Sequence, residues 1–130
     1  MKTYTTTPRP ERQPEITAFV ESELESAQAP FKVIAQINVA VDEIFSNIAQ
    51  YSGADELTVT CEAEEGTITL CFADNGAAYD PTGQTDPDVS LSAEQRELGG
   101  LGIYMVKKMM DRVSYEYSGG CNRLTIAKKW

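Results

Sequence analysis

Asn38-Val39-Ala40-Val41-Asp42-Glu43-Ile44-Phe45-Ser46-Asn47 is the stretch around which the rest of the chain is organised. It lies within a longer segment whose apolar residues recur at alternating spacings of three and four, which predicts one face of an amphipathic helix. That face comprises Ile34, Ile37, Val41, Ile44, Ile48 and Tyr51. At ~100° per residue, Glu43 and Asn47 fall on one edge of the apolar face. We therefore expect them to border both core and solvent, as the wall of a cleft does.

A carboxylate and a carboxamide one helical turn apart have two interpretations. Glu43 and Asn47 can share a small ligand such as hydrated Mg²⁺, which prefers oxygen donors. They are also ordinary residues at a boundary between a helix and solvent. Taken alone, the pair favours the boundary interpretation.

Composition and charge limit the possible functions. With 130 residues and 42% hydrophobic content, the chain fits one globular domain, residues 1–130, with a single core. The net charge of -9 argues against nucleic acid or an anionic membrane as the default partner. An acidic protein that binds a polyphosphate needs a cation or backbone donors to offset repulsion, so a bound nucleotide would imply Mg²⁺.

The sequence shows neither a membrane-spanning segment nor a signal peptide. No apolar run reaches the ~18 residues that a membrane span needs, and residues 1–13 lack the apolar core of a signal peptide. We therefore expect a cytoplasmic protein that has no membrane partner.

Cysteine and histidine usage narrows the chemistry. The three cysteines, Cys61, Cys71 and Cys121, lack CxxC spacing, which predicts reduced thiols rather than a disulfide framework or a zinc site. The chain has no histidine, which excludes Ser-His-Asp and Cys-His catalysis and a phosphoacceptor histidine. Any general base must therefore be a carboxylate, Lys, Tyr or Cys.

The remaining patterns predict the element order βααββαββ. The expected elements are a strand at 2–7, helices at 14–28 and 31–51, a hairpin within 57–73, a helix at 101–112, and a hairpin formed by 113–118 and 122–128. Pairing Ala63 with Ile68 places the large apolar residues of the first hairpin on one face, so helices should cover one side only. The fold class expected is α+β, a two-layer sandwich of about three helices on one face of a mixed, mostly antiparallel sheet.

Asp74-Asn75-Gly76 follows the end of the second hairpin strand. It is a good turn sequence on any fold. As a site, a carboxylate at a strand end can accept a hydrogen bond from an exocyclic amine such as that of adenine, and Gly76 lets the backbone approach a flat ring.

Gly99-Gly100-Leu101-Gly102 opens the last predicted helix. It can be a flexible helix entry, yet three glycines in four residues cost conformational entropy that a simple cap does not require. Exposed backbone N–H groups at a helix start bind phosphate oxygens. The segment lacks the Gly-Lys-Ser/Thr of a P-loop and does not directly follow a strand as a Rossmann fingerprint does.

These three features, in this order, resemble the signature boxes of the GHKL (Bergerat-fold) ATP-binding superfamily, which includes gyrase, Hsp90-class chaperones, histidine kinases and mismatch-repair proteins. The boxes here are Glu43-x-x-x-Asn47, Asp74-x-Gly76 and Gly99-Gly100-Leu101-Gly102. The runs Asp74–Pro81, Gly99–Asp111 and Gly119–Ile126 are similar to one branch in particular. That branch is the anti-sigma-factor serine kinases that control bacterial sporulation and stress responses.

The resemblance implies a Bergerat fold, a histidine-kinase-like ATP-binding domain, and a role for each motif residue. Glu43 is implied as the general base and Asn47 as the Mg²⁺ ligand. Asp74 is implied to accept from the adenine amine, with Gly76 beside the ring. The ATP phosphates are implied to bind at Gly100, Leu101 and Gly102, and residues 81–98 to form a lid in which Arg96 contacts phosphate. Positioning and charge neutralisation dominate phosphoryl transfer, so this set can suffice.

The function implied is a regulatory protein serine/threonine kinase that transfers the γ-phosphate of Mg-ATP to an antagonist, anti-anti-sigma-like protein. A sigma factor is a further implied partner, and a homodimer is the implied assembly. The chain departs from the family at Ala78, where many members have a second glycine, and at Gln50-Tyr51, where many kinases of the branch have a histidine.

Three alternatives remain open. The first is a nucleotide-gated interaction module without catalysis. The second is the ATP-binding half of a split histidine kinase, and the third is a helix-on-sheet domain that binds no nucleotide.

Overall fold

The computed structural model describes residues 1–64, 66–83 and 100–130. Within these residues the element order is the predicted one. The elements are β1 (Lys2–Thr6), α1 (Gln13–Ser26), α2 (Phe31–Asn47), β2 (Leu57–Glu64), β3 (Thr67–Asp74), α3 (Gly100–Met109), β4 (Arg112–Ser118) and β5 (Cys121–Lys129). Short turns of 3₁₀ helix occupy Pro10–Arg12 (η1) and Pro81–Gly83 (η3), and a π-helical turn, η2, occupies Ile48–Ser52.

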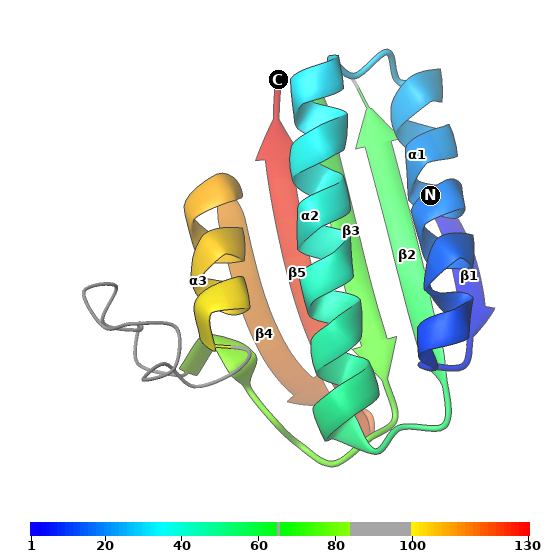
Figure 1. Ribbon diagram of the computed structural model, residues 1–130, viewed down its shortest axis with the longest axis vertical. Coiled ribbons are helices and arrows are strands. Elements are labelled where there is room, and N and C mark those ends of the chain that lie inside the picture. The colour runs from blue at the N-terminus through cyan, green and yellow to red at the C-terminus, as the bar shows by residue number, and fades with distance from the viewer. Residues whose placement is uncertain (65, 84–99) are drawn as a thin grey trace.

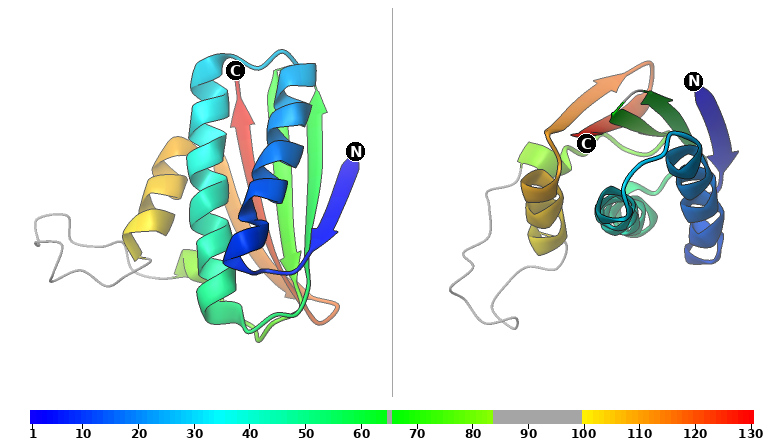
Figure 2. Two further views of the ribbon diagram at one scale, coloured as in Figure 1. Left: turned by 45° about the vertical axis from the view of Figure 1, so that its right-hand side comes forward. Right: turned by 90° about the horizontal axis from the view of Figure 1, so that it is seen from above.

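The strands form one five-stranded sheet in the order β1-β2-β3-β5-β4. The three described helices lie side by side on one face of it, with α2 between α1 and α3 (Figures 1 and 2). The predicted α+β two-layer sandwich is confirmed. The prediction of a mixed sheet is wrong in detail, since all four described pairings are antiparallel. Hairpins and a return connection join the strands, and these need no parallel crossover.

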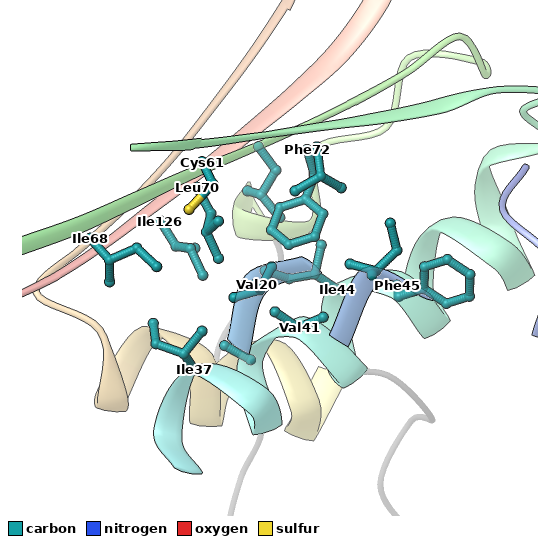
Figure 3. Close-up of a cluster of buried hydrophobic side chains, with 14 of the residues drawn as sticks. Val20, Ile37, Val41, Ile44, Phe45, Cys61, Ile68, Leu70, Phe72 and Ile126 are labelled. Carbon is teal, nitrogen blue, oxygen red and sulfur yellow. The ribbon is translucent and has the colours of Figure 1, made fainter. Parts of the chain in front are cut away.

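The predicted hairpin register is also confirmed. Ala63 pairs with Ile68 and Val59 pairs with Phe72. The burial of β2 and β3 alternates, because one face packs on the helices and the other is open. Side chains from this face meet those of α1 and α2 in the core, which Figure 3 shows around Ile37, Val41 and Phe72.

The central helix α2 matches its prediction up to its last turn. Ile37, Val41 and Ile44 are fully buried, but Tyr51, predicted on the same face, is 48% exposed. The chain passes into the π-helical turn η2 after Asn47, and the wider turn rotates later side chains away from the helical period. Periodicity alone cannot predict such a change of pitch.

The last helix is shorter than predicted. α3 ends at Met109 rather than at Arg112, because Arg112 already pairs with Ala127 in the sheet. Lys128 Nζ donates to the carbonyl oxygen of Met109 at 2.8 Å, which satisfies one of the free acceptors at the helix end.

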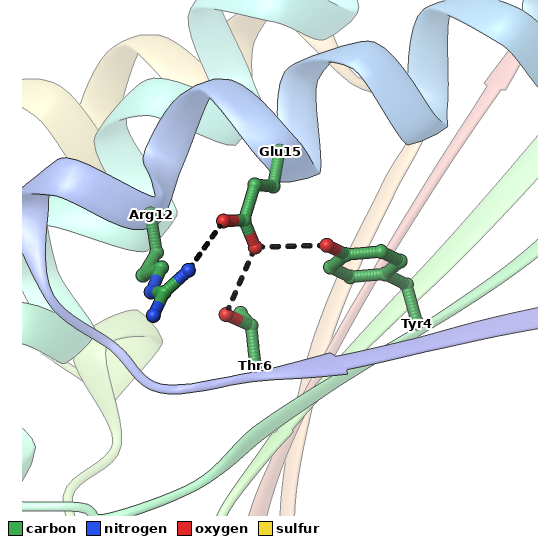
Figure 4. A network of polar contacts seen from close by, with 4 residues as sticks. All are labelled: Tyr4, Thr6, Arg12 and Glu15. Atoms are coloured by element: carbon green, nitrogen blue, oxygen red, sulfur yellow. Dashed lines mark hydrogen bonds and ion pairs between the residues drawn. The ribbon is translucent and has the colours of Figure 1, made fainter.

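The N-terminal strand β1 is attached to α1 by a polar network (Figure 4). Glu15 Oε1 accepts from the Tyr4 hydroxyl at 2.8 Å, and Glu15 Oε2 accepts from Arg12 Nη1 at 2.8 Å. The hydrogen bond from Arg12, then that from Tyr4, lowers the pKa of the Glu15 carboxyl. The network and the pairing with β2 hold this edge strand in place.

Candidate functional site

A pocket opens between the C-terminal part of α2 and the sheet. Its polar lining comprises Asn47, Ser52, Asp74 and Asn122. Its apolar and aromatic lining comprises Ile44, Ile48, Tyr79, Pro81, Tyr115 and Leu124. An apolar pocket with a few converging polar groups is typical of a small-molecule site.

Asp74 is the last residue of β3 and is only 4% exposed. Its Oδ1 accepts from the backbone N–H of Gly76 at 3.0 Å and from Asn122 Nδ2 at 3.1 Å. No described residue donates to Oδ2. The carboxylate is thus fixed through one oxygen, and the other is free to accept a hydrogen bond in the pocket.

Asn122 was not among the predicted site residues, and it is also only 4% exposed. Besides Asp74, it binds the loop that follows β3: Nδ2 donates to the carbonyl oxygen of Ala77 at 2.9 Å, and Oδ1 accepts from the N–H of Tyr79 at 3.0 Å. The Tyr115 hydroxyl also donates to Oδ1. One signal was available in the sequence, because Asn122 shares the inward face of β5 with Leu124 and Ile126 and is polar where an apolar residue is expected.

The packing gives a reason for a glycine at position 76 that the sequence does not predict. A Cβ at this position would overlap the backbone carbonyl oxygen of Ser52 and lie 2.8 Å from the carbonyl carbon. The N–H of the next residue, Ala77, donates to that same oxygen at 3.1 Å. The close approach that requires a glycine is therefore between two backbones of this chain, at the edge of the pocket.

Glu43 and Gly102 lie against each other. A Cβ on Gly102 would overlap Oε2 of Glu43 and lie 2.7 Å from its Cδ. Glu43 is half-buried, as its position on the edge of the apolar face predicts. The tertiary fold thus brings the carboxylate of α2 to the first turn of α3.

The predicted residues therefore fall into three groups. Asn47 and Asp74 line the pocket directly, and Gly76 borders it. Glu43 lies at the start of α3, the helix whose first residues are Gly100, Leu101 and Gly102. Arg96, Gly99 and most of the expected lid at 81–98 lie outside the described residues.

The ring of Tyr51 lies next to that of Tyr79. The rings of Tyr51 and Tyr79 are 6.4 Å apart between centroids and tilted by 34°, a spacing at which aromatic rings attract each other. Tyr79 lines the pocket and remains 41% exposed. The π-helical turn that displaced Tyr51 from the core thus brings its ring to the segment after Asp74.

The thiols take no part in this site. All three cysteines are free, as predicted. Cys61 faces the core, where burial raises its pKa to about 11, and Cys71 lies on the opposite face of the sheet. Within the described part of the chain, none of the helices is both long and apolar enough to cross a bilayer.

Comparison with known proteins shows the family. The family model of the histidine kinase-like ATPase domain matches residues 6–128, and the chain belongs to that family. The predicted GHKL resemblance is confirmed.

The chain is also similar to several curated serine kinases. Serine/threonine-protein kinase BtrW of Bordetella bronchiseptica is 32% identical over 96 residues, which cover 69% of this chain and 66% of that protein. Serine-protein kinase RsbW of Listeria monocytogenes is 28% identical over 98 residues, 69% of this chain and 62% of that protein. Serine-protein kinase RsbW of Bacillus cereus is 26% identical over 94 residues, which cover 67% of this chain and 59% of that protein. The match thus spans less than two thirds of each relative's length.

Proposed function

We propose that this protein is an ATP-dependent serine/threonine protein kinase that phosphorylates an antagonist protein. The observation that supports this most strongly is the convergence of Asn47 and Asp74 in one pocket, with the Glu43 carboxylate next to the first turn of α3. These residues come from separate parts of the chain. Their types match the acceptor, metal ligand and base that phosphoryl transfer from ATP requires.

The described residues fit a nucleotide. The pocket has apolar walls for a base, and Asp74 offers a fixed carboxylate oxygen that can accept from an adenine amine. The segment that starts α3 has glycines at 100 and 102, whose N–H groups at a helix start are suited to phosphate oxygens. Asn47 would hold Mg²⁺ through its side-chain oxygen, and the ion would offset phosphate charge in a protein of net charge -9. Arg96 is a proposed further phosphate contact.

The chemical step assigned to this chain is a proton transfer. Glu43 accepts the proton of a serine or threonine hydroxyl as that oxygen attacks the γ-phosphorus. The bond to the β–γ bridging oxygen breaks, and ADP leaves. A carboxylate is one of the side chains that can act as a general base in a sequence without histidine.

The partner proposed is an antagonist of the anti-anti-sigma type, with a sigma factor as a second partner. The names of the relatives support a protein substrate, because they are serine or serine/threonine protein kinases. The exposed edge strand β1 supports a homodimer, because an unpaired strand edge is able to bind a second copy.

Calorimetry with Mg-ATP and Mg-ADP tests the first part of this proposal. We expect binding by the wild type and at least a tenfold loss in Asn47→Ala and Asp74→Asn. A ligand at 100 times its Kd should raise the stability of the wild type by about 2.7 kcal/mol. If the wild type gains no stability from either nucleotide, the chain is a domain that binds no nucleotide.

Transfer of labelled γ-phosphate to candidate antagonist proteins tests the second part. Glu43→Gln should abolish transfer and retain ATP binding. Asp42→Asn is the matched control, since Asp42 is the neighbouring carboxylate on α2 and is bound to Gln13 on α1. ATP-dependent partner binding that persists without any transfer, in wild type and Glu43→Gln alike, would instead identify a non-catalytic, nucleotide-gated module.

A further inference from the structure

The amide of Asn122 is held in one orientation by five partners, one of which is the more distant carbonyl oxygen of Gly76, at 3.4 Å from Nδ2. Oδ1 accepts from the Tyr115 hydroxyl and from the N–H of Tyr79, while Nδ2 donates to Asp74 Oδ1 and to the carbonyl oxygen of Ala77. A flipped amide would place its oxygen against a carboxylate and a carbonyl, and its NH₂ against two donors. Such a group has only one satisfactory orientation.

This orientation determines which oxygen of Asp74 is available. Oδ1 already accepts from Gly76 N–H at 3.0 Å and from Asn122 Nδ2 at 3.1 Å. Rotating the carboxylate would break both bonds at a residue that is nearly fully buried, where an unmet hydrogen bond is costly. Oδ2 is therefore presented to the pocket as a fixed acceptor.

We propose that Asn122, oriented by Tyr115, is the positioning residue that makes this pocket select a base with an exocyclic amine over one with a carbonyl oxygen. The inference rests on the proposed nucleotide binding and assigns its base selectivity. An amine donates to Oδ2, whereas a carbonyl oxygen at the same place meets an acceptor with no hydrogen between them. Sites built around such a hydrogen bond discriminate strongly.

The test measures ADP against inosine diphosphate, which has a carbonyl oxygen where adenine has its amine, so that turnover plays no part. Titration calorimetry in the presence of Mg²⁺ should show the wild type preferring ADP by about a hundredfold or more. Asn122→Leu should lose most of its ADP affinity and little of its inosine diphosphate affinity, which reduces the preference to below about tenfold. Equal weakening of both ligands would mean a merely structural role and would overturn the inference.

Asn122→Leu removes five hydrogen bonds and can prevent folding, so Tyr115→Phe is the second variant. It removes one hydroxyl, and the preference should fall by about threefold to tenfold, as expected for one hydrogen bond. The matched control is Tyr117→Phe, the same change on the same strand at a side chain that is 49% exposed. An unchanged preference in Tyr115→Phe, or the same fall in Tyr117→Phe, would contradict the role of Tyr115.

A second control separates selectivity from loop stability. Asn75 Oδ1 accepts from the N–H of Asp55 at 2.9 Å and of Glu56 at 3.1 Å, which fixes the same loop from outside the pocket. Asn75→Ala should lower the melting temperature and leave the ratio of the two affinities unchanged. A wild type that binds neither nucleotide refutes the proposed function and this inference with it, whereas one that binds both equally refutes the inference alone.

Discussion

The carboxylate of Glu43 occupies the space that a side chain on Gly102 would fill. The two residues are far apart in the sequence, on α2 and on α3. Gly102 is therefore needed for packing against the candidate base, in addition to any role of its N–H toward phosphate. Gly76 is needed in a comparable way, but its neighbour is the backbone of Ser52. The two glycines should thus respond differently to the same substitution.

Gly102→Ala should impair catalysis without unfolding the protein. The added methyl group must displace the end of a flexible glutamate side chain, and alanine is favoured over glycine in a helix by roughly 0.5–1 kcal/mol. Because a general base contributes ~10²–10⁴ to rate, displacement of Glu43 should lower phosphoryl transfer at least tenfold. Urea unfolding measures the stability, and single-turnover experiments measure the rate of phosphoryl transfer. Transfer at the wild-type rate would contradict the prediction.

Gly76→Ala should destabilise the fold. Here the methyl group meets a backbone carbonyl that also accepts from Ala77 N–H, so relief requires moving two chain segments. Overpacking of this kind typically costs about 1–3 kcal/mol. Chemical denaturation should show a lower free energy of unfolding, with Gly102→Ala as the matched control. A stability equal to that of the wild type would contradict the prediction, because it would mean that the backbone around Gly76 can shift without cost.

Acid should weaken the attachment of β1. The pKa of Glu15 is lowered in the folded protein, chiefly by the hydrogen bond from Arg12. Its contribution to stability is therefore present above the ordinary value of 4.5 and is lost as the pH falls through the lowered pKa.

Melting temperatures measured from neutral to acidic pH test this. Glu15→Gln should be less stable than the wild type at neutral pH, and the difference should disappear in acid. Glu25→Gln, an exposed position on the same helix, serves as the control and should show no such convergence. A Glu15→Gln deficit that persists unchanged in acid would rule out the ionised network as its source.

Cys61 should react slowly with alkylating reagents. Its raised pKa, about 11, and its burial leave little accessible thiolate near pH 8. Cys71 and Cys121 are partly exposed and should be alkylated by iodoacetamide first, as peptide mass spectrometry can follow. Rapid labelling of Cys61 in the native protein would indicate that α1 or α2 opens away from the sheet.

Much of the fold was predictable because local patterns agree with one another. The register that pairs Ala63 with Ile68 places Leu70 and Phe72 on the same face, and that register is observed. The helical period likewise predicted the buried side of α2 and the burial of Ile48, the residue that follows it. Tyr51 was misplaced because a π-helical turn changes the period without a clear sequence signal.

The candidate site was predictable in part. Residue type and position predicted the motif residues. The structure places Asn47 and Asp74 in one pocket, Gly76 at its edge and Glu43 beside Gly102. Asn122 was missed because its importance arises from partners on three other segments: Asp74, the loop at residues 76–79, and Tyr115 on β4. The spacing of residues along the chain does not predict contacts between such distant segments.

The sequence by itself determined the order of elements, the inward faces of strands and helices, and the residue types available for chemistry, since each depends on neighbours within a few positions. Only the tertiary structure decided which donors bind Oδ1 of Asp74, why residues 76 and 102 must be glycine, and which carboxylate lies at the start of α3. Those relationships depend on segments that become neighbours when the core closes, and close packing then leaves one arrangement for each side chain.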